Sequence, residues 1–387
     1  MGKLRLYLPP FAPDYSGVCS ALFELGGLVV IHDGGGCTGN YTGYDEPRWY
    51  GSKSAVFCSG LREMDAVLGL DDRLIGKIKK ACEDVSAKFI AVLGSPVPML
   101  IGADMQGIAA ELEAELGIPC FGLDTSGLHL YPKGIGMAEK AIAKAFVKAP
   151  TQKRKKGINL LGMTPLDFSI NSNSEDLKEL LSVWGYTVVS SFDMGTSLEA
   201  VFHAAEAEVN LVVSAGGLAL AEYMEKTYGI PYVVGVAMGI SGAEALKEAL
   251  DLTMQDGQSR VLGKTVQNGE KKILFIGEQV QGNAFRAAYQ KKHGGASVRV
   301  GCIFGRKAEL AQPQDIELAD EQAIVQLLRK EAYDCVVADP LFAELIPVEK
   351  RESIRFAAFP HIAVSSKLHW DAVPVFLSEK MEKMLDC

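Results

Sequence analysis

The chain has 387 residues, 48% of them hydrophobic, and its formal net charge is −9 at pH 7. This length and composition exclude a disordered chain and predict two or three folded domains. The acidic balance, without a long run of Lys and Arg, argues against a nucleic acid partner, and the longest uncharged stretches, 89–103 and 229–243, are too short to span a membrane.

The cysteines and the start of the chain indicate a cellular compartment. No sustained apolar segment precedes Pro9, so we expect a cytoplasmic protein. Eight cysteines at irregular spacings do not resemble a disulfide framework. In a reducing compartment some of them should be free or bound to metal.

The most informative stretch of the chain lies near its start. A helix-like segment carries Cys19 and is followed by an apolar strand at 28–31 and then by the turn His32-Asp33-Gly34-Gly35-Gly36-Cys37. The glycines allow positive φ and let the backbone come close to whatever Cys37 holds. A thiol on a glycine turn at the end of a buried strand is a natural site for an iron–sulfur ligand.

The same strand–helix–strand order occurs three times along the chain. The strands are continuous apolar runs rich in Val and Ile, as in parallel sheets that are buried on both faces. Three similar α/β domains are therefore predicted. The paired strands are expected at 88–94 and 117–123, at 209–214 and 229–234, and at 334–338 and 359–364.

Polar stretches separate these units. Residues 151–156 follow a predicted helix at 138–148, and residues 267–272 precede a predicted strand at 273–276. We therefore expect an N-terminal domain that carries Cys19 and Cys37, at 1–153, a second domain at 154–268 and a third at 269–387.

A first glycine motif allows a dinucleotide-binding interpretation. Gly34-x-Gly36-x-x-Gly39 follows a strand, but residues 40–47 suggest a loop where that fold needs a helix. Residues 54–58 hold none of the acidic residues that would bind a ribose. A tight turn in an α/β domain explains this motif better.

A second glycine motif has the spacing of a phosphate-binding loop. It runs from Gly277 to Gly282, but Asn283 and Ala284 stand where Lys and Ser or Thr would bind phosphate and Mg²⁺. It is again better explained as a strand-to-helix turn, so the chain should not hydrolyse ATP by itself.

Several motifs, taken in order, resemble the component 1 superfamily of nitrogenases and nitrogenase-like reductases. The resemblance covers nearly the whole chain and implies three Rossmann-like domains around a central cleft. The motifs are Cys19, the turn His32–Cys37, the segment Met64–Gly69, the strand 90–93 followed by 100–104, the Gly-Ile-Pro at 117–119 and the segment Asp124–Gly127.

Departures from the family pattern limit what the resemblance implies. Ser95 follows the strand after which related subunits often place a third cluster cysteine, and residues 213–216 lack the cysteine that anchors the large metal cofactor of the catalytic subunit. His361 lies near the place of that cofactor's histidine ligand. We therefore do not expect a genuine dinitrogenase subunit, and an additional metal cofactor in the cleft stays an open alternative.

The two cysteines imply an assembly. A [4Fe-4S] cluster takes four protein ligands, mostly thiolates, and this chain offers Cys19 and Cys37. The resemblance therefore implies a cluster shared across a dimer interface, either in a homodimer or in a heterodimer with a homologous subunit. Cys58 and Asp33 are reserve ligands, and Asp45 is a further non-thiol candidate.

By resemblance, the chain is an iron–sulfur oxidoreductase that receives electrons from an ATP-dependent iron protein and reduces a substrate in the cleft. His361, Arg48 and Tyr44 are the catalytic candidates, although Tyr44 and Arg48, with Tyr41, Trp49 and Tyr50, equally suit a donor-docking face or plain loop packing. The alternatives are a scaffold for metal-cofactor assembly and, from a different class, a nucleotide- or NAD-binding α/β enzyme.

Overall fold

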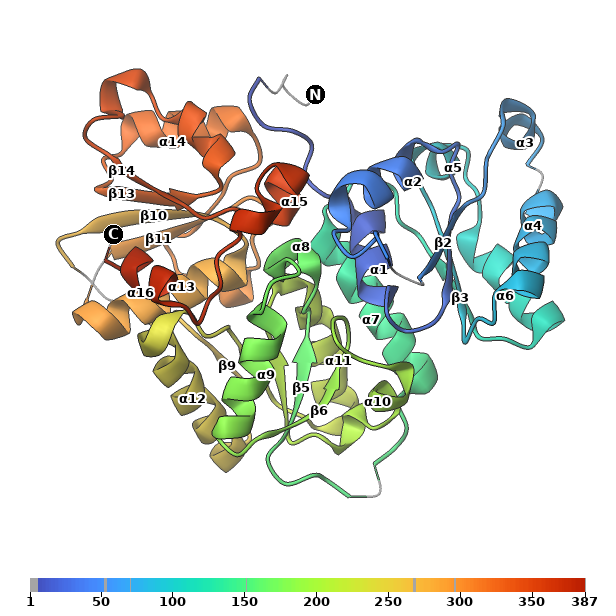
Figure 1. Cartoon of the computed structure of the whole chain (residues 1–387), viewed down its shortest axis with the longest axis horizontal. Helices are drawn as coiled ribbons and strands as arrows, with labels where there is room; N and C mark the ends of the chain where they lie inside the picture. The colour runs from blue at the N-terminus through green and yellow to red at the C-terminus, as the bar shows by residue number, and fades with distance from the viewer. Residues whose placement is uncertain are drawn as a thin grey trace.

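The computed structural model describes residues 6–51, 54–69, 71–150, 152–266, 269–295 and 297–386. The chain forms three lobes, each built on one sheet of parallel strands (Figure 1). The predicted α/β fold with three Rossmann-like parallel sheets is therefore confirmed. None of the helices within the described ranges is long and apolar enough to cross a membrane.

The first sheet consists of β2 (Ala55–Cys58), β1 (Leu28–Ile31), β3 (Ile90–Leu93) and β4 (Cys120–Leu123), in that order. Every residue of β1 and β3 is buried, because helices cover both faces. One face packs on α4 (Asp71–Asp84) and α6 (Met105–Leu116), and the other on α1 (Asp14–Leu22) and α7 (Tyr131–Phe146). The shorter helices are α2 (Gly36–Asn40), a π-helical turn at Tyr41–Asp45, α3 (Glu63–Leu68) and α5 (Pro96–Leu100).

The second sheet consists of β6 (Thr187–Ser191), β5 (Gly157–Leu161), β7 (Val209–Val212), β8 (Tyr232–Val234) and β9 (Arg260–Val261), in that order. Its apolar residues alternate between two clusters, so both faces are covered. The helices of this lobe are α8 (Pro165–Phe168), α9 (Asn173–Val183), α10 (Leu198–Phe202), α11 (Leu218–Tyr228) and α12 (Gly239–Asp256).

The third sheet consists of β12 (Ile316–Glu317), β11 (Ser297–Cys302), β10 (Lys272–Gly277), β13 (Cys335–Ala338) and β14 (Arg355–Ala358), in that order. Its central strands β10 and β13 are almost wholly buried. The helices of this lobe are α13 (Gln279–His293), α14 (Glu321–Lys330), α15 (Ile362–Ser365) and α16 (Glu379–Met384).

The predicted loop at 40–47 is wrong. Most of this segment is helical, because it continues from α2 into the π-helical turn. Tyr41 holds it against the core, since its ring is fully buried and its hydroxyl donates to the Glu46 carboxylate (3.2 Å). The sequence suggested a loop because Gly43 and Pro47 break the helical pattern.

The predicted strand at 359–364 is also wrong. The edge strand β14 ends before it, at Ala358, and α15 begins at Ile362. Pro360 has no N–H to donate to a sheet, and the His361 side chain accepts from the Ala363 N–H (3.2 Å) at the start of α15.

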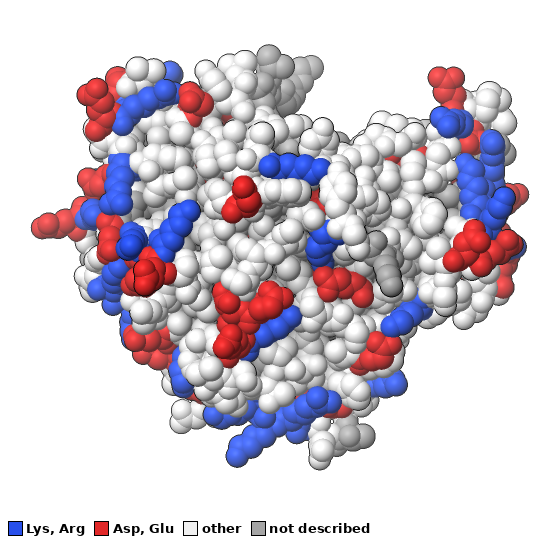
Figure 2. Space-filling view, in the orientation of Figure 1, with Lys and Arg blue, Asp and Glu red and all other residues white. Residues whose placement is uncertain are grey.

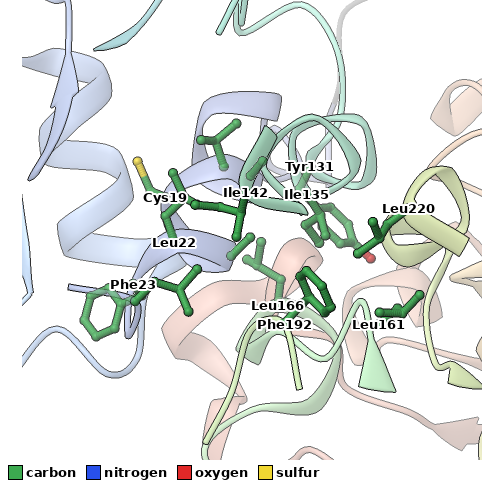
Figure 3. Packing of buried hydrophobic residues seen from close by; sticks show 14 of the residues in the cluster. Cys19, Leu22, Phe23, Tyr131, Ile135, Ile142, Leu161, Leu166, Phe192 and Leu220 are labelled. Carbon is green, nitrogen blue, oxygen red and sulfur yellow. The ribbon is translucent and has the colours of Figure 1, made fainter. Parts of the chain in front are cut away.

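Helices α1 and α7 cross closely where the first and second lobes meet (Figure 3). Gly17 and Gly134 allow this approach, since a Cβ built on Gly17 would lie 2.1 Å from the Tyr131 carbonyl oxygen and one on Gly134 would lie 1.8 Å from the Asp14 carbonyl oxygen. The backbones touch because no side chain separates them. This contact holds α1, and with it Cys19, against the core shared with the second lobe.

Both ends of the described chain contact lobes other than their neighbours in sequence. Leu8 and Phe11 belong to the apolar core of the third lobe, and the N–H groups of residues 6–8 donate to the Glu321 carboxylate. Helix α16 packs against α12 of the second lobe. The domain limits 1–153, 154–268 and 269–387 stay a proposal, and the second limit falls at residue 268, which lies outside the described residues.

Candidate cluster site and interdomain cavity

Cys37 lies where the strand order of the first sheet reverses. From β1 the chain moves to β2 on one side and then returns to β3 on the other side, so the loops after β1 and β3 diverge. The turn His32–Cys37 follows β1, and Ser95 follows β3 at the start of α5. Ligands of parallel sheets bind in the crevice at such a position.

Hydrogen bonds shape the turn before Cys37. The Asp33 carboxylate accepts from the backbone N–H groups of Gly35 (2.9 Å) and Thr38 (3.1 Å). Gly35 has a φ of 127°, which a residue with a side chain would adopt only with strain. The half-buried Cys37 thiol therefore faces the Tyr15 hydroxyl and Ser95, and burial raises the pKa of this thiol.

Cys19 lies on α1, one helical turn after Tyr15, and is fully buried. Because Tyr15 contacts the Cys37 thiol, α1 and the turn bring both cysteines to one region. Burial and the charges of Glu46 and Asp45 raise the pKa of Cys19 well above its usual range. Sequence reasoning missed Tyr15, although its spacing of four residues from Cys19 was a signal.

The front of the turn is open. A Cβ built on Gly35, Gly36 or Gly39 would meet no heavy atom within 4 Å. On the neighbouring helix α5, the apolar side chains of Val97 and Leu100 are 49% and 84% exposed. The surface over α2 and α5 carries few charged side chains (Figure 2). Apolar surface beside a half-buried thiol is typical of a face that another protein covers.

The reserve ligands have different surroundings. Cys58 is exposed at the end of β2, and its sulfur lies 3.3 Å from the Asp33 carbonyl oxygen. Asp45 is buried and accepts from Ser16 (2.6 Å) and Asn40 (3.0 Å), and burial raises its pKa to about 7. The carboxylates of Asp33 and Asp45 thus help to hold the segments around Cys37.

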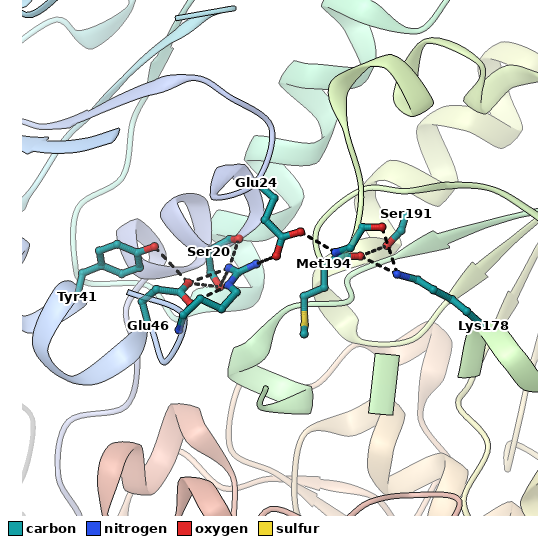
Figure 4. Close-up of polar contacts among 9 residues, drawn as sticks. Ser20, Glu24, Tyr41, Glu46, Lys178, Ser191 and Met194 are labelled. Atoms are coloured by element: carbon teal, nitrogen blue, oxygen red, sulfur yellow. Dashed lines mark hydrogen bonds and ion pairs between the residues drawn. The ribbon is translucent and has the colours of Figure 1, made fainter. Parts of the chain in front are cut away.

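Arg48 links the α1 region to the second lobe through Glu46 and Glu24, which Figure 4 shows with their polar contacts. Its guanidinium pairs with Glu46 (2.8 Å) and Glu24 (2.9 Å) and lies 4.3 Å from the centroid of the Phe23 ring. Glu24 in turn accepts from the Gly195 N–H of the second lobe (2.7 Å). These contacts give Arg48 a positioning role for α1.

Tyr44 and Tyr50 belong to an exposed aromatic cluster that includes the third lobe. The Lys367 ammonium lies 6.0 Å, 4.8 Å and 5.7 Å from the ring centroids of Tyr44, Tyr50 and Trp370. The two tyrosines are 58% and 70% exposed. Cation–π contacts of this kind tie the segment after Cys37 to the third lobe. No sequence signal connected Lys367 or Trp370 with this segment.

The donor atoms of one chain fit half of a cluster site. In the part of the chain that the structure describes, no group of three or more His, Cys, Asp or Glu is placed to hold a metal ion. Cys37 is half-buried beside the open front of the turn, Cys19 is buried on the adjacent helix α1, and Ser95, not a cysteine, follows β3. This donor set fits a four-ligand cluster completed by a second chain and does not fit one held within a single chain.

The three lobes meet at a buried polar cluster that contains His361. Tyr131 of α7 donates to Asp167 of α8 (2.5 Å), and His361 Nε2 lies 3.3 Å from the same carboxylate. Glu278 at the start of α13 accepts from the Ala215 N–H (3.0 Å), and burial together with the charge of Asp167 raises the pKa of Glu278 to about 8. His361 is only 4% exposed, so this candidate lies in a packed junction.

A cavity of about 1240 Å³ lies between the lobes. Helix α7 lines it from the first lobe, residues 303–307 line it from the third, and the second lobe contributes Ala215, Gly216, Leu218 and Ala219. This cavity is the predicted central cleft. The segment 213–216 contributes Ala215 and Gly216, and no cysteine lines the cavity among the described residues.

Three parallel-sheet lobes around one cavity, with a thiol where the first sheet reverses its strand order, define a Rossmann-like α/β protein with a candidate cluster site. The chain belongs to the nitrogenase component 1 type oxidoreductase family, whose model matches residues 13–272.

Curated relatives carry different names within this family. The nitrogenase molybdenum-iron protein alpha chain of Clostridium pasteurianum is 25% identical over 236 residues, which are 59% of this chain and 43% of that protein. The nitrogenase iron-molybdenum cofactor biosynthesis protein NifE of the same organism is 28% identical over 196 residues, 50% of this chain and 41% of that protein. This chain therefore spans less than half the length of these two relatives.

Two further comparisons extend the likeness. One subunit of the light-independent protochlorophyllide reductase of Zygnema circumcarinatum is 33% identical over 113 residues, 29% of this chain and 22% of that protein. The solved structure of nitrogenase Cp1 at pH 5 matches with a TM-score of 0.67 and 17% identity, over 100% of this chain and 88% of that chain. At this identity the structural match shows the fold alone.

Proposed function

We propose that this chain is a redox subunit that binds one [4Fe-4S] cluster at a dimer interface, through Cys19 and Cys37 of each chain. The observation that carries this proposal is the half-buried Cys37 thiol at the reversal point of the first sheet, in contact with Tyr15 one turn before Cys19. A homodimer supplies four thiolates by twofold symmetry. A homologous subunit that brings the missing ligands is the other assembly.

The residues around the proposed site have separate roles. The cluster, when bound, supplies one-electron transfer. Gly35 and Gly36 leave room in front of Cys37, and the Tyr15 hydroxyl contacts the Cys37 sulfur and restricts its orientation. The exposed apolar residues of α5 supply surface that the second chain would cover.

We propose that electrons come from a separate ATP-dependent iron protein and that a substrate is reduced in the interdomain cavity. The turn after β10 does not offer a nucleotide site in this chain. A Cβ on Gly282 would lie 2.6 Å from Val300, and the Asn283 side chain donates to the Leu310 carbonyl (2.8 Å). Packing within the third lobe therefore accounts for this turn. ATP hydrolysis must then take place in a partner protein.

Electron transfer between the two proteins tests this function. The chain is mixed anaerobically with an ATP-hydrolysing iron protein, dithionite and MgATP, and oxidation of the donor's cluster is followed together with ATP hydrolysis. We expect transfer that requires MgATP and is lost in Cys37→Ser, while Cys82→Ser, a control on the half-buried face of α4, retains it. Equal transfer from a ferredoxin without ATP would contradict the proposal.

A scaffold for metal-cofactor assembly is the second candidate. It is favoured by the likeness to NifE proteins of Clostridium pasteurianum, Rhodobacter capsulatus and Methanosarcina barkeri, at 28%, 25% and 23% identity. A scaffold would release a metal cofactor to a recipient protein, whereas a reductase would turn over a substrate with the metal content unchanged.

The nucleotide- or NAD-binding alternative has little support. A dinucleotide site needs a long helix whose N-terminus faces the pyrophosphate. The turn at Gly34–Gly39 instead leads into α2, which has 5 residues and continues as a π-helical turn.

A further inference from the structure

The charged groups that line the interdomain cavity form two layers. Lys140 of α7 and Arg306 of the loop after β11 are half-buried, so they form the inner layer. The outer layer contains both signs of charge and is exposed to solvent. Its members are Glu113, Asp124, Lys133, Lys144, Glu222, Lys307, Glu309 and Glu317.

The inner charges lack partners within the described residues. The Arg306 Nε is buried and has no hydrogen-bond partner there, and neither Arg306 nor Lys140 forms an ion pair with any carboxylate of the described chain. A buried donor without a partner is costly, because it has lost water and gained nothing. An anionic group bound in the cavity would supply the counter-charge that these two lining cations lack.

The wall beside these cations is apolar and built from small residues. Helix α7 presents Gly136, Met137 and Ala141 to the cavity, and the second lobe presents Gly216 and Ala219. A Cβ on Gly136 would lie 3.1 Å from both Ala219 and the Gly216 carbonyl oxygen, so these glycines allow α7 and the second lobe to approach closely. The wall therefore offers apolar surface from small side chains beside the two cations.

We propose that the cavity binds an organic anion whose apolar body lies on this wall and whose carboxylate, or a similar anionic group, lies between Lys140 and Arg306. The inference rests on the proposed function and names its substrate class. The volume of about 1240 Å³ exceeds the roughly 300–1,000 Å³ typical of sites for drug-sized ligands, so it is far larger than a diatomic substrate needs. The described lining offers no thiolate to anchor a metal cofactor.

A matched pair of probes tests the charge requirement. Anilinonaphthalene sulfonate carries an apolar body and one anionic group, and phenylnaphthylamine has the same rings without the sulfonate. Fluorescence titration of the full chain should show saturable binding of both. We expect the double variant Lys140→Gln with Arg306→Gln to raise the Kd of the sulfonate by about tenfold or more, because it loses two charge-assisted contacts. The Kd of the uncharged probe should stay unchanged.

Lys226→Gln is the control variant, since Lys226 is an exposed residue of α11 that does not line the cavity. If the double variant does not fold, Lys140→Gln and Arg306→Gln are measured singly, and each should raise the Kd of the sulfonate severalfold. An equal loss of both probes, or an unchanged Kd of the sulfonate, would overturn the proposal. So would a metal other than cluster iron whose content falls in the double variant.

The outcome is separable from that of the proposed function, because the probes bind without the cluster. The titration is repeated in the Cys37→Ser background, where charge-dependent binding should persist without the cluster. Charge-dependent binding in the unsubstituted chain, together with a failure of that chain to acquire iron under anaerobic purification, would contradict the redox function alone. A complete cluster in a chain without charge-dependent binding would contradict the substrate class alone.

Discussion

The turns after β1 and β10 occupy equivalent places in two lobes, since each lies where its sheet reverses its strand order. After β1, a Cβ on Gly36 would meet nothing within 4 Å, and a half-buried thiol follows. After β10, a Cβ on Gly282 would lie 2.6 Å from Val300, and Glu278 is buried as a helix cap. The first turn leaves room for a ligand, whereas the second is filled by the protein itself.

The largest expected effect is loss of the cluster from the open turn. Cys37→Ser or Cys19→Ser should abolish the [4Fe-4S] content of anaerobically purified protein, because serine is a poor ligand for iron–sulfur clusters. Iron analysis and low-temperature EPR of the reduced protein measure this content. Cys58→Ser is the control for the reserve ligand, and this variant should retain the cluster. Full cluster content in the Cys37 variant would show that the open turn is not the site.

The sequence predicts those features of the two turns that depend on residues close together in the chain. Continuous apolar runs predict the strands at 28–31 and 90–93, because such runs are typical of strands buried on both faces, and the glycine turn makes Cys37 a candidate ligand. The edge strand at 355–358 was placed too late, since its half-exposed residues lack such a run. Lys140 and Arg306 could not be paired, because only the packing of the lobes brings them to one cavity.

Two glycine substitutions should affect different properties of the protein, one its stability and the other its iron content. Gly282→Ala should lower the free energy of unfolding by about 1–3 kcal/mol, because the added methyl group overpacks a buried contact with Val300 and Phe275. Gly36→Ala should change it by less than about 0.5 kcal/mol but lower the iron content, since its methyl group enters the open space before Cys37. Urea unfolding and iron analysis of both variants measure these effects. A loss of unfolding free energy in Gly36→Ala as large as that in Gly282→Ala would contradict this difference between the two turns.

Two buried carboxyl groups where the first and second lobes meet should make the free energy of unfolding depend on pH. Glu139 of α7 and Asp193 of the second lobe are buried side by side, and burial and their mutual repulsion raise the pKa of Glu139 well above its usual range. The folded chain therefore binds a proton that the unfolded chain releases above about pH 4. The free energy of unfolding should fall as pH rises from there through the raised pKa, on the order of 1 kcal/mol per pH unit.

Glu139→Gln isolates this contribution. Its amide can donate to the Asp193 carboxylate without a titrating proton, while its oxygen still accepts from the Gly162 N–H, as Glu139 does (2.7 Å). Urea unfolding at pH 5 and pH 8 should show a smaller loss of stability in the variant than in the unchanged chain. Equal losses would mean that this pair does not hold the proton.

Native mass spectrometry of the anaerobically purified protein is the most direct test of a cluster shared between two chains, because it counts chains and cluster atoms in one particle. With this chain alone, we expect a particle of two chains, each of 41.6 kDa, with four iron and four sulfide atoms, and separation of the chains when the cluster is removed. A single chain that retains four iron and four sulfide atoms would contradict it.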